Sequence, residues 1–178
     1  ARTLQGIDEP RVALLSVELG YENGLEGADL RTLGLAGLLH DMGKREIDEA
    51  ILSGTSPLSE DERSAMDEHP RRGARLLEED LYTKVRQIVV GHHEYHTSAF
   101  PRQGSDRRAV DRVVDNDRRE KDETIEMLTQ IVAVADMCDA LASTRSYKES
   151  FAKTEIGAAL YEQYTGDPVY VGQVLRRV

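Results

Sequence analysis

The chain has 178 residues, which is the size of one domain. Its formal net charge is −10, and it contains two phenylalanines and no tryptophan. A surface that binds a long nucleic acid needs a basic stripe, so this acidic balance argues against that class of partner. The apolar residues are mostly Leu, Val, Ala and Ile, which suit packed helices better than aromatic-rich strands. We therefore predict an all-α fold.

The compartment is indicated by cysteine content and by the length of apolar runs. A single cysteine, Cys138, permits no internal disulfide and suits a reducing compartment. No apolar run approaches the roughly 20 residues of a membrane helix, and no apolar stretch follows the N-terminal residues as in a secretory leader. We expect a cytoplasmic protein without a membrane segment in this chain. Because the sequence begins with alanine, a domain cut from a larger protein is a reasonable expectation.

Apolar residues at helical spacing predict a helix from about Pro10 to the glycines at positions 24 and 27. A second helix is predicted from about Asp29, with the His40–Asp41 pair at its end, and Gly43 then turns the chain. Leu30, Leu33, Ala36 and Leu38 are its predicted apolar residues.

The middle of the chain carries two helix-start signals and one apolar helical face. Ser59 and Glu62 form a capping box that predicts a helix through Met66, and Pro70 predicts the start of another. From Lys84, an apolar face ends in the histidines at positions 92 and 93. Residues 102–126 are dominated by charge of both signs, and we expect a solvated, flexible insertion there.

Regular structure is predicted to resume at Leu128 as a buried helix that carries Asp136. A final amphipathic helix is predicted near Ile156 to Tyr164, followed by a short terminal piece. We treat residues 1–178 as a single domain.

All five histidines lie between His40 and His96. The pair of His40 and Asp41, His69, and the pair of histidines at 92 and 93 offer imidazole and carboxylate groups, which suit Fe, Mn, Zn or Ni. The absence of paired cysteines argues against a structural zinc site. Two metals roughly 3.5–4 Å apart can share a bridging hydroxide that attacks a phosphodiester. Taken alone, a His–Asp pair is also compatible with a polar helix terminus, and a histidine before proline with a cap.

Asp136 lies among apolar neighbours, where an unpaired carboxylate is costly. It must be paired with a basic group, protonated or bound to metal. Asp139 follows one turn later on the same face, which suits a water-orienting role. Lys44 is placed to neutralise a phosphate oxygen. Arg145 and Lys148 are either phosphate contacts or ordinary surface residues.

Several of these runs resemble a known family. The run His40-Asp41-Met42-Gly43-Lys44 resembles the signature of the HD superfamily of metal-dependent phosphohydrolases. Two further stretches are similar to the HD-GYP subfamily: His92-His93-Glu94 with Ala99-Phe100-Pro101 beyond it, and Val134 to Leu141 continuing to Arg145-Ser146-Tyr147-Lys148. The resemblance extends from about Arg11 to the C-terminus.

This resemblance implies a helical bundle around a metal centre of usually iron or manganese, with nickel or zinc as alternatives. It also implies hydrolysis of the bacterial second messenger cyclic di-GMP to pGpG or GMP by a metal-bridging hydroxide, with a sensory domain, receiver domain or signalling protein as partner. Carried over by residue, it implies that Asp41 bridges the metals, that Lys44, Arg145 and Lys148 hold phosphates, and that Asp139 lies near the hydroxide. The implied metal ligands are His40, Asp41, His69, His92, His93 and Asp136.

The chain departs from the HD-GYP pattern in three places. Ala99-Phe100-Pro101 replaces Gly-Tyr-Pro, so Phe100 can stack on a guanine but has no hydroxyl to donate. The positions of two upstream ligands hold Leu4 and Asp8, which favours two metals over three. The charged stretch 102–126 is longer than its counterpart. A degenerate module that binds a ligand or a protein partner without efficient turnover is therefore the alternative to the enzyme.

Overall fold

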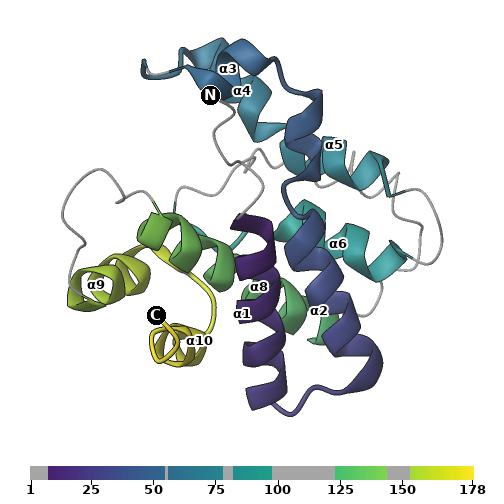
Figure 1. Cartoon of the computed structure of the whole chain (residues 1–178), viewed down its shortest axis with the longest axis vertical. Helices are drawn as coiled ribbons and strands as arrows, with labels where there is room; N and C mark the ends of the chain where they lie inside the picture. Colours follow the sequence, from purple (N-terminus) through teal and green to yellow (C-terminus); the bar gives the residue numbers. More distant parts are fainter. Residues whose placement is uncertain (1–7, 55, 78–81, 98–122, 144–152) are drawn as a thin grey trace.

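Helix α8 (Glu123–Ser143) is the central element, and it contacts α1 (Asp8–Glu22), α2 (Gly27–Leu39), α6 (Thr83–Gly91), α9 (Lys153–Gln163) and α10 (Pro168–Val174) (Figure 1). The side chains from 131 to 135 are fully buried. A helix packed on several sides needs apolar residues around most of its circumference, which this run supplies. The prediction of a buried helix carrying Asp136 is confirmed.

The computed structural model describes residues 8–54, 56–77, 82–97, 123–143 and 153–178. Within these ranges it contains helices and one isolated antiparallel bridge, between His96 and Tyr164, but no strand. The predicted all-α fold is confirmed. None of the described helices is both long and apolar enough to cross a membrane.

Helices α1 and α2 form an antiparallel pair joined by a short turn (Figure 1). Gly24 and Gly27 adopt φ values of +80° and +52°, which other residues rarely adopt, so the two glycines permit this turn. Leu33 and Ala36 of α2 are buried as predicted, whereas Leu38 is 44% exposed. Leu38 therefore does not belong to the apolar face that was predicted for this helix.

The central part of the chain contains short helices in addition to those predicted. The capping box of Ser59 and Glu62 opens α4 (Glu60–Asp67), as predicted. Helix α5 (His69–Arg75) begins one residue before Pro70. The turn after Asp41 is a 3₁₀ helix, η1 (Met42–Glu46), and α3 (Glu49–Ser53) follows it; neither was predicted.

The start of α8 shows that the predicted flexible insertion was drawn too long at its C-terminal end. It begins at Glu123, so the last four residues of the interval 102–126 are helical, while 102–122 lie outside the described residues. Glu123 and Glu126 occupy the first turn, where a negative charge interacts favourably with the positive end of the helix dipole.

Polar contacts fasten α10 to the end of α1, and we call this group the C-terminal seam. The side-chain amides of Asn23 and Gln173 exchange two hydrogen bonds, of 2.7 and 3.2 Å. Arg177 bonds Glu18 at 3.1 Å, and Glu22 accepts from both terminal arginines. The seam consists of Glu18, Glu22, Asn23, Gln173, Arg176 and Arg177.

Candidate metal centre

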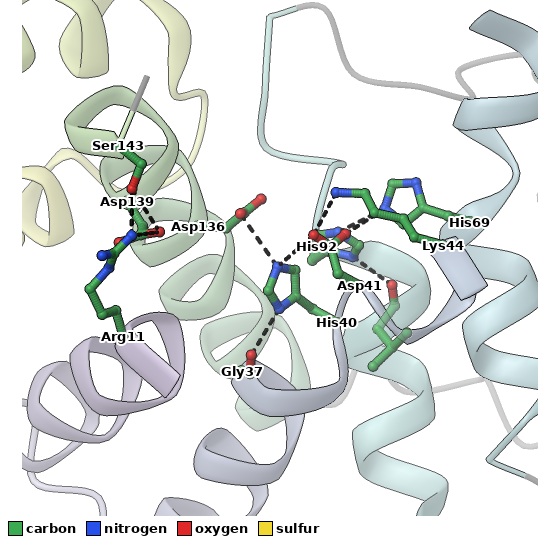
Figure 2. A network of polar contacts seen from close by, with 11 residues as sticks. Arg11, Gly37, His40, Asp41, Lys44, His69, His92, Asp136, Asp139 and Ser143 are labelled. Carbon is green, nitrogen blue, oxygen red and sulfur yellow. Dashed lines mark hydrogen bonds and ion pairs between the residues drawn. The ribbon is translucent and has the colours of Figure 1, made fainter. Parts of the chain in front are cut away.

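The six predicted ligands come together from four separated parts of the chain, and we call them the ligand cluster. They are supplied by the end of α2, the start of α5, the end of α6 and the middle of α8. Figure 2 labels all of them except His93. Ligand atoms of three of them, His69, His92 and His93, all lie within 4.8 Å of one another. The ligand cluster consists of His40, Asp41, His69, His92, His93 and Asp136.

Asp41 lies between two of the histidines (Figure 2). Its Oδ1 is 3.1 Å from Nε2 of His69, and its Oδ2 is 3.5 Å from Nε2 of His40. Nε2 of His40 also lies 3.4 Å from Oδ1 of Asp136. The two carboxylates and these two rings therefore form one continuous chain of polar contacts.

Three of the rings are oriented in the same way by the ends of helices. Nδ1 of His40, His69 and His92 lies 2.7–2.8 Å from the carbonyl oxygen three residues earlier, which belongs to the last turn of α2, α4 and α6, respectively. Carbonyls in a last helical turn have no partner within their own helix, and a carbonyl only accepts, so each Nδ1 carries the hydrogen. Each Nε2 is thereby left to act as a ligand.

The ends of α2, α4 and α6 also bring three negative helix-dipole ends to the cluster. A negative dipole end stabilises a nearby positive charge. These three ends contribute a negative potential at the cluster, while the start of α5 at His69 contributes the opposite sign.

The spacing of two ring nitrogens provides a test of whether the residues fit a metal. Nε2 of His69 and Nε2 of His92 lie 3.4 Å apart. Two nitrogens at roughly 2.0–2.1 Å from one ion in tetrahedral geometry are separated by about 3.3–3.4 Å. The observed separation matches this value, and a cation between the two rings would accept the Nε2 lone pairs of both once Nε2 carries no proton. The donor set fits a metal.

The electrostatics of the cluster keep most of its members in the form that binds metal. Burial lowers the pKa of His93 to about 4, and burial together with neighbouring histidine charge lowers the pKa of His92 well below its ordinary value. Burial opposes ionisation of Asp41, but hydrogen bonds from His40 and His69 outweigh it and hold its pKa well below its usual range. Neutral rings and ionised carboxylates are the forms that coordinate metals.

His40 is the exception. Burial disfavours its charged form, but the hydrogen bonds and negative charges of Asp136 and Asp41 outweigh burial and raise its pKa to about 10. A metal that binds His40 at Nε2 therefore displaces a proton.

Lys44 lies beside the cluster, with Nζ 2.5 Å from Oδ2 of Asp41, and its role as a phosphate contact stays a prediction. Asp139 is placed differently. Its carboxylate accepts from Nε and Nη2 of Arg11 at 2.7 and 3.2 Å, and Figure 2 shows it turned toward α1 and Ser143. The guanidinium engages both oxygens, so Asp139 links α8 to α1 instead of orienting water beside the cluster. This corrects the expectation.

The remaining predicted positions cannot be compared with the structure. Phe100 with its neighbours Ala99 and Pro101, and likewise Arg145, Lys148 and Leu4, lie outside the described residues. Asp8 is the first residue of α1, so this position lies at the start of that helix.

Arg11 is a polar partner that the sequence analysis missed. Asp139 is 5% exposed and, like Asp136, lies among apolar neighbours, so its carboxylate also needs a partner. A basic residue is one such partner, but the sequence does not say which one. The carbonyl partners of the histidines carry no signal in the side-chain pattern.

Comparison with known proteins is consistent with this arrangement. A model of the HD domain family matches residues 11–141. A cyclic di-GMP phosphodiesterase response regulator of Xanthomonas campestris pv. campestris is 36% identical over 86% of this chain and 38% of its own length. A cyclic di-GMP phosphodiesterase of Thermotoga maritima is 30% identical over 78% of this chain and 34% of its length.

A further relative has a different nucleotide in its name. The 3′3′-cGAMP-specific phosphodiesterase 2 of Vibrio cholerae is 28% identical over 89% of this chain and 28% of its own length. The chain thus spans about a third of the length of these curated relatives.

Proposed function

Since the chain belongs to the HD domain family, we propose that it is a metal-dependent phosphodiesterase that hydrolyses a cyclic dinucleotide. The family is metal-dependent, and His69, His92 and His93 form a group that could hold a metal ion. The observation that carries the proposal is the convergence of these rings with the carboxylates of Asp41 and Asp136. The relatives named as phosphodiesterases favour turnover over the alternative of a binding module.

We propose two divalent metals, held on either side of Asp41. His40 and Asp136 would hold one, since Nε2 and Oδ1 lie 3.4 Å apart. His69, His92 and His93 would hold the other. Asp41 is suited to bridge because its two oxygens face His69 and His40 separately. Iron or manganese is the proposed identity, with nickel or zinc as alternatives, because imidazole and carboxylate ligands suit all four.

When bound, such a pair of metals supplies an activated water and neutralises negative charge on the phosphate. The histidine rings are held by helix-end carbonyls, so their Nε2 atoms need little reorganisation. Lys44 is partly exposed and lies against Asp41, so its ammonium can exchange Oδ2 for a phosphate oxygen. Arg145 and Lys148 are proposed as further phosphate contacts, and Phe100 as a stacking platform for a base.

Cyclic di-GMP and 3′3′-cGAMP both occur in the names of relatives, so experiment decides which of them is the natural substrate. Cyclic di-GMP is our first choice, with pGpG or GMP as product. A sensory or receiver domain elsewhere in a longer protein is a further proposal, supported by the relative named as a response regulator.

The test is to load the purified chain with Fe²⁺ or Mn²⁺ without oxygen, add each cyclic dinucleotide and separate the products by chromatography. We expect linear dinucleotide from at least one substrate. Arg176→Ala, which alters an exposed residue of the C-terminal seam, is the matched control and should retain turnover. Tight binding of a cyclic dinucleotide without product would contradict the enzyme and favour the binding module.

A further inference from the structure

Gly43 lies at the contact between two segments that carry proposed ligands. It belongs to η1, directly after Asp41, and η1 packs against α5, which begins with His69. A Cβ atom added to Gly43 would lie 1.9 Å from the carbonyl oxygen of His69 and 2.4 Å from the backbone nitrogen of Gly73. Distances this short are overlaps, so no side chain fits at Gly43 unless one of the two segments moves.

The atoms that Gly43 meets belong to backbone and not to flexible side chains. Gly73 is its counterpart on α5: a Cβ there would lie 3.2 Å from the nitrogen of Gly43 and 3.3 Å from Cγ1 of Val89. Val89 in turn supplies the carbonyl that accepts from Nδ1 of His92. The Gly43–Gly73 contact therefore lies where the segments that carry Asp41, His69 and His92 meet.

The glycine at this position is required for space and not for an unusual backbone conformation. Among the described residues, positive φ values occur only at Gly24 and Gly27. Alanine is therefore compatible with the backbone angles of Gly43, and its methyl group is the sole obstacle. A substitution to alanine thus tests the separation of the segments with little other change.

The distance that this contact controls is that between Asp41 and His69. Oδ1 of Asp41 is 3.1 Å from Nε2 of His69. A 2.9 Å hydrogen bond from the nitrogen of Lys44 to the carbonyl of Asp41 fixes the backbone between Asp41 and Gly43, so this backbone has little freedom to change its conformation. A displacement at Gly43 is therefore transmitted to Asp41.

We propose that Gly43 is a positioning residue, with Gly73 as its packing counterpart, and that it sets the separation at which Asp41 and His69 bind one cation together. This inference rests on the metal centre proposed above. It assigns to Gly43 a role in metal affinity that a glycine of ordinary helix packing does not have.

The experiment compares Gly43→Ala, Gly73→Ala and the matched control Gly34→Ala, in which the added methyl group meets only Cγ2 of Val17, at 3.4 Å. Metal affinity is measured by competition with a chelator, and folding by circular dichroism. We expect Gly43→Ala to keep its helical signal and to bind metal roughly tenfold to a hundredfold more weakly, as when an outer-shell partner is lost. Gly73→Ala should weaken binding less, and Gly34→Ala should equal the parent chain.

Metal affinity in folded Gly43→Ala equal to that of Gly34→Ala would overturn the proposal. If Gly43→Ala does not fold, Gly73→Ala decides: weaker metal binding at unchanged thermal stability supports the proposal, and unchanged binding overturns it.

If the parent chain binds no metal, the proposed metal centre is wrong, and the positioning role of Gly43 needs a separate test. Metal-free crystals of Gly43→Ala or, if it does not fold, Gly73→Ala, compared with Gly34→Ala, then provide the test. A separation between Asp41 and His69 longer than 3.1 Å supports the positioning role, and an unchanged separation contradicts it.

Discussion

The ligand cluster and the C-terminal seam are both polar groups that join helices far apart in the chain, but they satisfy their hydrogen bonds differently. In the seam, donors meet acceptors: the amides of Asn23 and Gln173 bond each other, and Arg177 bonds Glu18 and Glu22. In the cluster, the backbone accepts the Nδ1 hydrogens of His40, His69 and His92, and the carboxylates of Asp41 and Asp136 lie 3.1–3.5 Å from ring Nε2 atoms.

This difference is the one expected between polar groups that stabilise a fold and polar groups that bind a cation. A polar network that is satisfied by itself stabilises the fold and needs no further component. Converging imidazoles and carboxylates are also metal ligands, and a cation binds to them in exchange for protons. The seam should therefore affect stability without affecting metal binding, and the cluster should do the reverse.

The largest effect is expected from Asp41→Asn, which removes the charge between the two halves of the cluster. Loss of an outer-shell partner alone costs roughly 10- to 100-fold in metal affinity or activity, so a bridging ligand should cost more than about a hundredfold. Metal content and turnover are the measurements, and circular dichroism checks the fold. Full metal content in Asp41→Asn would contradict the assignment of Asp41 as a metal ligand and, with it, the contrast between the cluster and the seam.

Asp139→Asn tests the corrected position of that carboxylate. The substitution weakens two hydrogen bonds from Arg11 to a buried group, and we expect a loss of about 1–3 kcal/mol in unfolding free energy. Metal content should not change. Loss of metal at unchanged stability would contradict this position and support the predicted role of Asp139 beside the metal centre.

Gln173→Ala tests the seam. It removes two hydrogen bonds between Gln173 and the half-buried side chain of Asn23, whose Nδ2 keeps its bond to the carbonyl of Leu19, so urea denaturation should show a loss of about 0.5–1.5 kcal/mol. Metal affinity should stay the same. Its control is Arg176→Ala, because the side chain of Arg176 is 62% exposed and surface pairs contribute about 0–1 kcal/mol. A seam variant that loses metal at full stability would show that the two regions are coupled.

The smallest effect concerns Cys138, which is buried in α8 two residues after Asp136. Burial raises the pKa of its thiol to about 11, so little thiolate exists near neutral pH. Iodoacetamide at pH 8 should label Cys138 slowly in the folded chain and rapidly in urea, as followed by mass spectrometry. Equal rates would indicate that α8 is accessible and that the cluster is less rigid than described.

The sequence predicted those features that depend on local pattern or on a single unfavourable placement. The need of Asp136 for a partner was predicted because its carboxylate lies among buried apolar residues. The capping box of Ser59 and Glu62 was predicted because it depends only on a local spacing. Helix α10 was missed although Asp167 caps it and Pro168 occupies its first turn, a signal that the sequence does contain.

Other features could not be predicted because they depend on contacts between distant segments. Arg11 and Asp139 are 128 positions apart, and nothing in the local pattern selects Arg11 from the other basic residues. The requirement for glycine at position 43 arises from the backbone of α5 and becomes visible only when η1 and α5 are placed together.

The most direct test of the metal centre is anomalous diffraction from crystals of the chain loaded with Fe²⁺ or Mn²⁺. Two peaks roughly 3.5–4 Å apart are expected, with Asp41 between them, His40 and Asp136 beside one and His69, His92 and His93 beside the other. A folded chain with no anomalous peak among these six side chains would contradict the account.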